Sequence, residues 1–124
     1  MSYREPLPAD CPPKEAEEIT ELRNVFRLTK TDPATLDDFW SQRAENPEVV
    51  FQVPECQARG LSVFADRGDS EKARKLPKLR GRFICRVRLE AGAGRIQQTG
   101  KPSHHTWWPL AEFDILAHCA IEAV

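Results

Sequence analysis

The clearest pattern in the chain is an alternation of apolar and polar residues over positions 81–90. Side chains of a β-strand point alternately to opposite faces, so this pattern predicts a strand with one buried and one exposed face. The expected buried residues are Phe83, Cys85, Val87 and Leu89, and the expected exposed residues are Arg86, Arg88 and Glu90. Similar but shorter runs predict strands at 24–30, 48–53, 59–66, 95–99 and 104–110. The apolar segment 112–124 fits either a strand or a helix.

Three segments carry helix signals instead. Residues 13–23 start with a proline and acidic residues, which suits the first turn of a short surface helix. Residues 31–47 place Leu36, Phe39 and Trp40 on one helical face, and Thr35 and Asp38 have the spacing of a capping box. Residues 69–76 start with Asp69 or Ser70 as a cap and have basic residues in the last turn.

Helices come early in this order and hairpins come late. That order predicts an α+β fold, with a mostly antiparallel sheet and two or three short helices in a single domain. Four prolines fall within residues 1–13, which predicts an extended or disordered N-terminal arm before a domain at 14–124.

Composition narrows the function classes. The 124 residues include 18 basic and 19 acidic side chains, a net charge of -1, so nothing draws the whole protein to nucleic acid or anionic membrane. No apolar run approaches the roughly 20 residues that cross a bilayer, and the N-terminus lacks the apolar core of a signal peptide, which together predict a cytoplasmic protein. The four cysteines form no CxxC pair, so we expect free reduced thiols rather than a disulfide or a zinc ribbon.

The segment KPSHHTWWP, residues 101–109, concentrates two histidines and two tryptophans. One interpretation is structural: a strand whose tryptophans bury area and whose histidines satisfy hydrogen bonds. The other is the wall of a site, with His104 or His105 as acid, base or ligand and Trp107 or Trp108 as a stacking surface. Neighbouring histidines point to opposite faces of a strand, so they do not readily share one metal ion, and we predict no metal site.

Arg27 and Ser62 are further candidates, each with two interpretations. Arg27 lies within an apolar strand and either reaches solvent or clamps an anion such as a phosphate. Ser62 is either an outward strand residue or a hydroxyl at the lip of a pocket. The stretch 71–82 holds six Lys or Arg residues, either as a solvated helix end and loop or as a phosphate-contacting patch over 72–82. No GxSxG motif indicates a nucleophilic triad.

The segments VFRLTK, DFWSQRA, CQARGLSVF and SHHTWWP together resemble a family of small uncharacterised bacterial proteins. They also resemble, more faintly, the ADP-ribosyltransferase-like fold. That resemblance implies a dinucleotide held by an arginine on an early strand and a serine on a following one, positions that Arg27 and Ser62 would fill. The third position is normally a glutamate, and the HHTWWP strand near that position carries none.

These observations lead to three hypotheses. The first is a small nucleotide-binding protein, enzyme or not, with Arg27 on phosphate, Ser62 near ribose, and His104 or His105 as acid or base beside Trp107 or Trp108. The second is a non-catalytic protein-interaction or accessory module that uses exposed Trp107 or Trp108. The third is a nucleic-acid binder through residues 72–82, which the near-neutral net charge disfavours.

Overall fold

A computed structural model describes residues 2–123, which form one seven-stranded sheet in the order β1-β5-β6-β3-β2-β4-β7. Every pair of neighbouring strands runs antiparallel. The strands are β1 (Glu17–Glu18), β2 (Arg23–Thr29), β3 (Leu61–Phe64), β4 (Phe83–Leu89), β5 (Gly94–Gln98), β6 (His104–Pro109) and β7 (Cys119–Ile121). The predicted α+β fold with a mostly antiparallel sheet is therefore confirmed.

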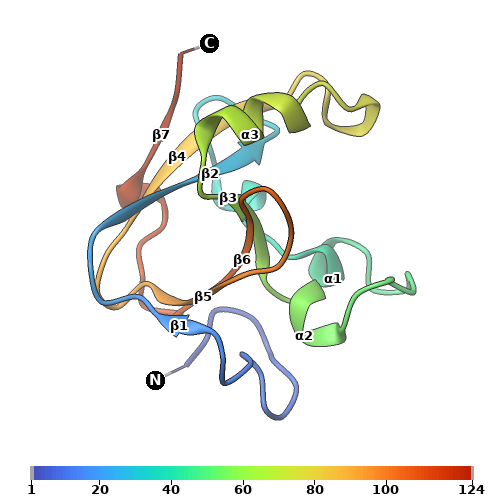
Figure 1. Ribbon diagram of the computed structural model, residues 1–124, viewed down its shortest axis with the longest axis vertical. Coiled ribbons are helices and arrows are strands. Elements are labelled where there is room, and N and C mark those ends of the chain that lie inside the picture. The colour runs from blue at the N-terminus through green and yellow to red at the C-terminus, as the bar shows by residue number, and fades with distance from the viewer. Residues whose placement is uncertain (1, 124) are drawn as a thin grey trace.

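In the part of the chain that the structure describes, three short α-helices and three 3-10 turns complete the fold. The helices are α1 (Gln42–Glu45), α2 (Glu55–Ala58) and α3 (Arg67–Ala73), and the 3-10 turns are η1 (Leu36–Asp38), η2 (Pro77–Leu79) and η3 (Leu116–His118). Figure 1 shows α3 beside one end of β2. The helices α1 and α2 lie together, near the start of β3. Within residues 2–123, no helix is long and apolar enough to cross a membrane.

From Cys85 onward, β4 follows the predicted alternation, but Phe83, expected in the core, is only half-buried, and Ile84 on the opposite face is fully buried. Cys85, Val87 and Leu89 are fully buried, while Arg86 and Arg88 are exposed. These apolar residues belong to one core cluster that also takes in side chains from β2, β3, β5, β6 and the loops. The other buried members are Ile19, Val25, Phe39, Leu61, Val63, Ala93, Ile96, Trp107 and Ile115.

The helix predicted at 13–23 is wrong. Glu17 and Glu18 pair with Ile96 and Arg95 as the edge strand β1, and the Ile19 amide donates to the Gly94 carbonyl. Ile19 and Leu22 are the only large apolar residues of this segment, and they bury too little apolar surface to hold a helix against the core. Pairing with the edge of β5 satisfies the backbone hydrogen bonds of the segment directly. The segment 31–47 forms η1 and α1 in place of one helix, because the chain leaves the helical path between them and buries Phe39 in the core.

The strand predicted at 48–53 is also wrong. The Arg43 guanidinium donates to the carbonyls of Asn46, Pro47 and Val49, which turns this segment into a loop around one side chain. Val50 is 90% exposed, so the apolar run does not mark a buried strand. The strands at 24–30, 59–66, 95–99 and 104–110 and the helix at 69–76 are confirmed to within a few residues, and 112–124 contains both η3 and β7.

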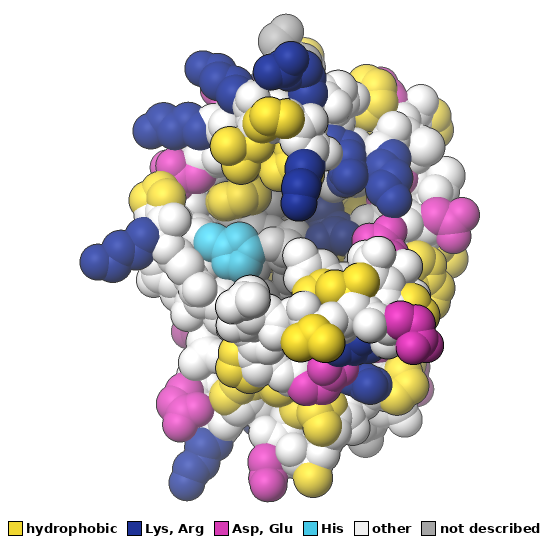
Figure 2. All heavy atoms as spheres, turned by 90° about the vertical axis from the view of Figure 1, so that its right-hand side faces the viewer, with side chains coloured by type: hydrophobic (Ala, Val, Ile, Leu, Met, Phe, Trp, Pro, Cys, Tyr) yellow, Lys and Arg dark blue, Asp and Glu magenta, His cyan; other side chains and the backbone are white. Residues whose placement is uncertain are grey.

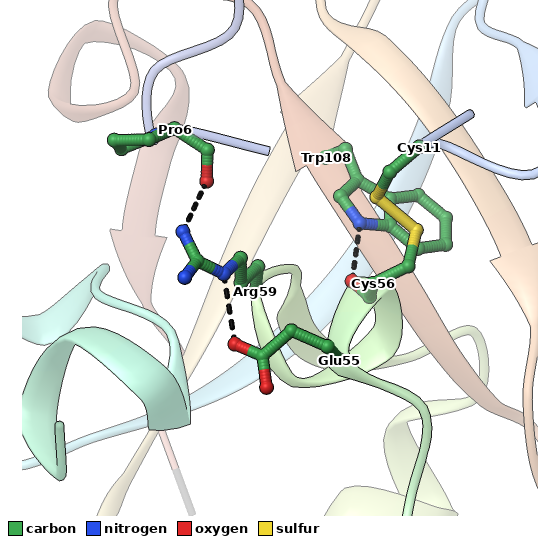
Figure 3. The surroundings of a disulfide bond; sticks show 6 residues. All are labelled: Pro6, Cys11, Glu55, Cys56, Arg59 and Trp108. Atoms are coloured by element: carbon green, nitrogen blue, oxygen red, sulfur yellow. Dashed lines mark hydrogen bonds and ion pairs between the residues drawn. A yellow bond between two sulfur atoms is a disulfide. The ribbon is translucent and has the colours of Figure 1, made fainter. Parts of the chain in front are cut away.

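The expectation of four free thiols is wrong. Cys11 and Cys56 form a disulfide, with Cα atoms 5.6 Å apart, that ties the N-terminal segment to α2, while Cys85 and Cys119 are free. Figure 3 shows the disulfide beside Trp108, whose indole N–H donates to the Cys56 carbonyl over 2.9 Å. The 45-residue separation carries no local signal, so only the folded backbone reveals the pair.

We predict that reducing this disulfide destabilises the protein by about 2–4 kcal/mol, because the cross-link closes a long loop in the unfolded chain and lowers its conformational entropy. Urea unfolding of the wild-type protein with and without reductant measures the change. Thiol titration in denaturant should find two free thiols before reduction and four after it. The Cys119→Ser variant is the control and should lose the same stability on reduction. An unchanged unfolding midpoint after verified reduction would contradict the prediction.

We also predict that Gly94→Ala destabilises the fold more than Gly92→Ala. Both glycines have positive φ, so both substitutions carry a backbone penalty of about 1–2 kcal/mol. A Cβ on Gly94 would in addition lie 2.1 Å from the Trp108 carbonyl oxygen, whereas one on Gly92 meets nothing within 4 Å. Urea unfolding of the two variants isolates the effect of this close approach between β5 and β6. Equal losses of stability would contradict the prediction, because the two strands would then accommodate the added methyl group without cost.

Candidate functional site

The sheet opens between β2 and β3. These two strands pair only at Phe26 and Phe64, whereas β2 and β4 pair at seven positions from Arg23–Leu89 to Thr29–Phe83. Beyond that pair the strands separate, and a cleft of about 580 Å³ lies along the opening. Figure 2 shows the hollow, with a histidine on one wall and lysine and arginine side chains along its upper edge.

The cleft is lined by residues from the centre of the sheet and from the segments that flank it. Its lining contains three cations, Arg27, Lys78 and Arg82, against one carboxylate, Glu45. This is a local excess of positive charge in a chain whose net charge is -1. Two aromatic side chains, Trp40 and Phe64, add apolar surface. The other lining residues are Leu28, Gln42, Asn46, Val53, Gln57, Gly60, Ser62, Leu79, His104 and Thr106.

Arg27 spans the opening between the two strands. Its Nε donates to the Asp38 carbonyl over 2.8 Å, its Nη1 to the Ser62 carbonyl over 2.9 Å, and its Nη2 to the Trp40 carbonyl over 3.2 Å. No carboxylate of residues 2–123 lies within ion-pair distance of it. Arg27 is therefore both a structural brace and a cation without a direct counter-ion.

Burial is the main reason that the pKa of Arg27 falls to about 10. The nearby positive charge of Arg82 adds to this lowering of the pKa, while Glu45 and Asp38 oppose it. The guanidinium stays charged at neutral pH because its pKa still lies well above 7. Arg27 and Arg82 thus repel each other beside the cleft, and an anion between them would relieve that repulsion.

Ser62, His104, Thr99 and Thr106 form a chain of side-chain hydrogen bonds on one wall of the cleft. The Ser62 hydroxyl is hydrogen-bonded to His104 Nε2. Nδ1 of His104 lies 2.9 Å from Thr99 Oγ1, which in turn lies 2.8 Å from Thr106 Oγ1. Antiparallel pairing of β3 with β6 sets this arrangement, since Phe64 faces His104 and Ser62 faces Thr106.

The imidazole of His104 is held from several sides. Phe64 contacts it edge-on, with ring centroids 5.6 Å apart, and Gly100 packs so closely that a Cβ there would lie 3.2 Å from the His104 Cβ. Burial lowers the pKa of His104 below its ordinary 6.5, and the neighbouring His105 lowers it further. At neutral pH the ring is therefore an uncharged base.

The structure brings together three of the six predicted site residues: Arg27, Ser62 and His104 all line the cleft. His105 does not line it and instead lies 2.8 Å from the Ser103 carbonyl through Nδ1. Trp107 and Trp108 are buried at 0% and 1% exposure, with indole N–H groups bonded to the carbonyls of Ala93 and Cys56. The tryptophan at the cleft is Trp40, whose ring is held by the Arg4 guanidinium 4.0 Å above it.

The sequence alone does not point to Trp40 or Thr99 as site residues. The spacing of Trp40 predicts the apolar face of a helix, and that helix is interrupted at this point. Thr99 follows β5 and meets His104 only because β5 and β6 pair. Lys78 and Arg82 belong to the basic stretch whose two interpretations were a solvated helix end and loop or a phosphate-contacting patch, and these two residues line the cleft.

Comparisons of the chain with protein-family models, with curated proteins and with solved structures found no match. The resemblances to a bacterial family and to the ADP-ribosyltransferase-like fold gain no support from them. Among residues 2–123, no group of three or more His, Cys, Asp and Glu side chains is placed to hold a metal ion. The interpretation of the cleft therefore depends on its own geometry.

We predict that His104 makes the protein less stable in mild acid. Because the pKa of His104 is lower in the folded protein than its ordinary 6.5, the unfolded chain takes up that proton more readily. The free energy of unfolding should therefore decrease as pH falls below about 6.5, and His104→Gln should remove this part of the decrease. Urea unfolding as a function of pH measures this decrease, and His118→Gln is the control. A His104 imidazole that titrates above 6.5 by NMR would contradict the prediction.

Proposed function

We propose that the cleft between β2 and β3 binds a nucleotide, with its phosphates at Arg27, Arg82 and Lys78. The supporting observation is the pair Arg27 and Arg82, two cations beside one cavity that have no ion-pair partner among residues 2–123. A planar guanidinium binds phosphate through paired hydrogen bonds, and here the anion would also offset the repulsion between two positive charges.

The remainder of the lining favours a nucleotide over a free phosphate ion. A cavity of about 580 Å³ is within the range that holds small organic ligands. Trp40 and Phe64 supply apolar and aromatic surface for a base, and Gln42, Asn46 and Gln57 supply amide groups for its edges. Ser62 is exposed to the cleft and offers a hydroxyl to the ligand.

The two alternative hypotheses have less support. A protein-interaction surface built on Trp107 and Trp108 requires exposed rings, and both rings are buried. A nucleic-acid surface over 72–82 requires its cations to act together. Two of them, Lys78 and Arg82, line the cleft instead, while Lys72, Lys75 and Arg80 are exposed on the helix end and loop.

We predict that ADP binds the wild-type protein and binds Arg82→Ala at least about tenfold more weakly. This corresponds to losing one charge-assisted hydrogen bond of about 1.5–3 kcal/mol. Isothermal titration calorimetry measures both affinities. Arg88→Ala is the matched control, because it removes the same charge from an exposed position on β4 outside the cleft.

Titrations with adenosine and with pyrophosphate separate the two ends of the ligand, and each should bind more weakly than ADP. Circular dichroism confirms that each variant is folded. Absence of binding at millimolar ADP would refute the proposal. An equal loss of affinity in Arg82→Ala and Arg88→Ala would also refute it, since the effect would then come from net charge rather than from the cleft.

A further inference from the structure

The hydrogen-bond chain on the cleft wall joins a serine hydroxyl, an imidazole and a further hydroxyl, the three groups that a nucleophile, its base and an orienting partner require. Ser62 is exposed to the cleft, so its hydroxyl is accessible to a bound ligand. The pKa of His104 lies below 6.5, so the ring is uncharged at neutral pH and one of its two nitrogens carries the proton. In the tautomer with the proton on Nδ1, that N–H donates to Thr99 Oγ1, Thr99 donates to Thr106 Oγ1, and Nε2 accepts a hydrogen bond from the Ser62 hydroxyl. This is the tautomer in which His104 can act as a base toward Ser62.

We infer that Ser62 is a nucleophile, activated by His104 as general base, that attacks the terminal phosphoryl group of a nucleoside phosphate bound in the cleft. The inference rests on the proposed nucleotide-binding function and adds a reaction to it. A nucleophile within hydrogen-bond reach of a base that is itself oriented by a third group is the arrangement that activates a serine hydroxyl. Thr99 has the third role here.

Arg27 determines which group of the ligand meets Ser62. Three of the five N–H bonds of its guanidinium are used on carbonyls, and one of those carbonyls belongs to Ser62. An anion on the remaining N–H bonds therefore lies next to Ser62. The guanidinium is a fixed positive charge at the place where charge on a phosphoryl group would develop during transfer.

The reaction balances without a cofactor. The Ser62 Oγ–P bond forms while the bond from phosphorus to the leaving oxygen breaks, and the Ser62 proton moves to His104 Nε2 and then to the leaving oxygen. This gives phosphoserine and the shortened nucleotide. A water molecule then attacks phosphorus, loses its proton to His104, and releases inorganic phosphate as Ser62 regains its hydroxyl proton.

We test the inference with an alkyl fluorophosphonate, a phosphorus electrophile that reports on an activated serine hydroxyl. Mass spectrometry should locate the adduct on Ser62, and labelling of His104→Gln should be at least about 100-fold slower, the usual contribution of a general base. His118→Gln, which removes a histidine outside the cleft, should label at the wild-type rate. Thr99→Val should give an intermediate rate, because the ring loses its orienting partner.

The pH dependence and the nucleotide supply two independent readouts. The labelling rate should increase with pH and reach half of its maximum below about pH 6.5, since protonation of His104 removes the base. Saturating ADP should protect Ser62, and the wild-type protein but not Ser62→Ala should release inorganic phosphate from ADP.

Absence of a Ser62 adduct, equal labelling of wild type and His104→Gln, or absence of phosphate release would each overturn the inference. Calorimetry keeps this result separate from the proposed function. If ADP binds but Ser62 is not labelled, nucleotide binding stands and the nucleophile is refuted. If Ser62 is labelled but ADP neither binds nor protects, the proposed nucleotide binding is refuted. A nucleoside phosphate is then also refuted as the substrate of Ser62.

Discussion

The separation of β2 from β3 determines where this protein can hold a ligand. A continuous sheet would pair the backbones of both strands and leave no space between them, but here only Phe26 and Phe64 are paired. Arg27 spans the opening with hydrogen bonds to the Ser62 carbonyl of β3 and to the carbonyls of Asp38 and Trp40. Removing a guanidinium from water is costly unless its N–H groups are satisfied, so the same side chain stabilises the open sheet and places a positive charge in the cleft.

Side chains at the two ends of β6 lie on the same face of the strand but have different surroundings. His104, Thr106 and Trp108 alternate along that face, but Trp108 is covered by α2 and the N-terminal segment while His104 lines the cleft. The Cys11–Cys56 disulfide and the Arg59 bond to the Pro6 carbonyl fasten that cover (Figure 3). Because Gln57 and Gly60 at this end of the cleft belong to α2 and the turn after it, the cover also shapes the wall of the site.

The sequence predicted the strands of this fold better than its helices, for a physical reason. Period-two alternation over 85–90 matches the burial of Cys85, Val87 and Leu89, whereas the helix signals at 13–23 and 31–47 describe local preferences that tertiary contacts override. Strand parity also separated His104 from His105. The alternation of side chains could not predict that Trp107 and Trp108 are both buried. It shows which face of the strand a residue lies on, but not which other segments cover that face. The disulfide and the bond between Thr99 and His104 join residues that only the folded chain brings together.

Charge and proton affinity in the cleft depend on each other. Burial and His105 favour the neutral form of His104, and Arg27 and Arg82 leave the cavity positively charged. A bound phosphate reverses both conditions, because its negative charge compensates the arginines and favours a proton on a nearby imidazole. In the proposed complex, His104 would therefore become a stronger base when the anion is in place. The cleft would keep Ser62 and His104 neutral and hydrogen-bonded while empty, and would strengthen the proton acceptor only beside the group that Ser62 attacks.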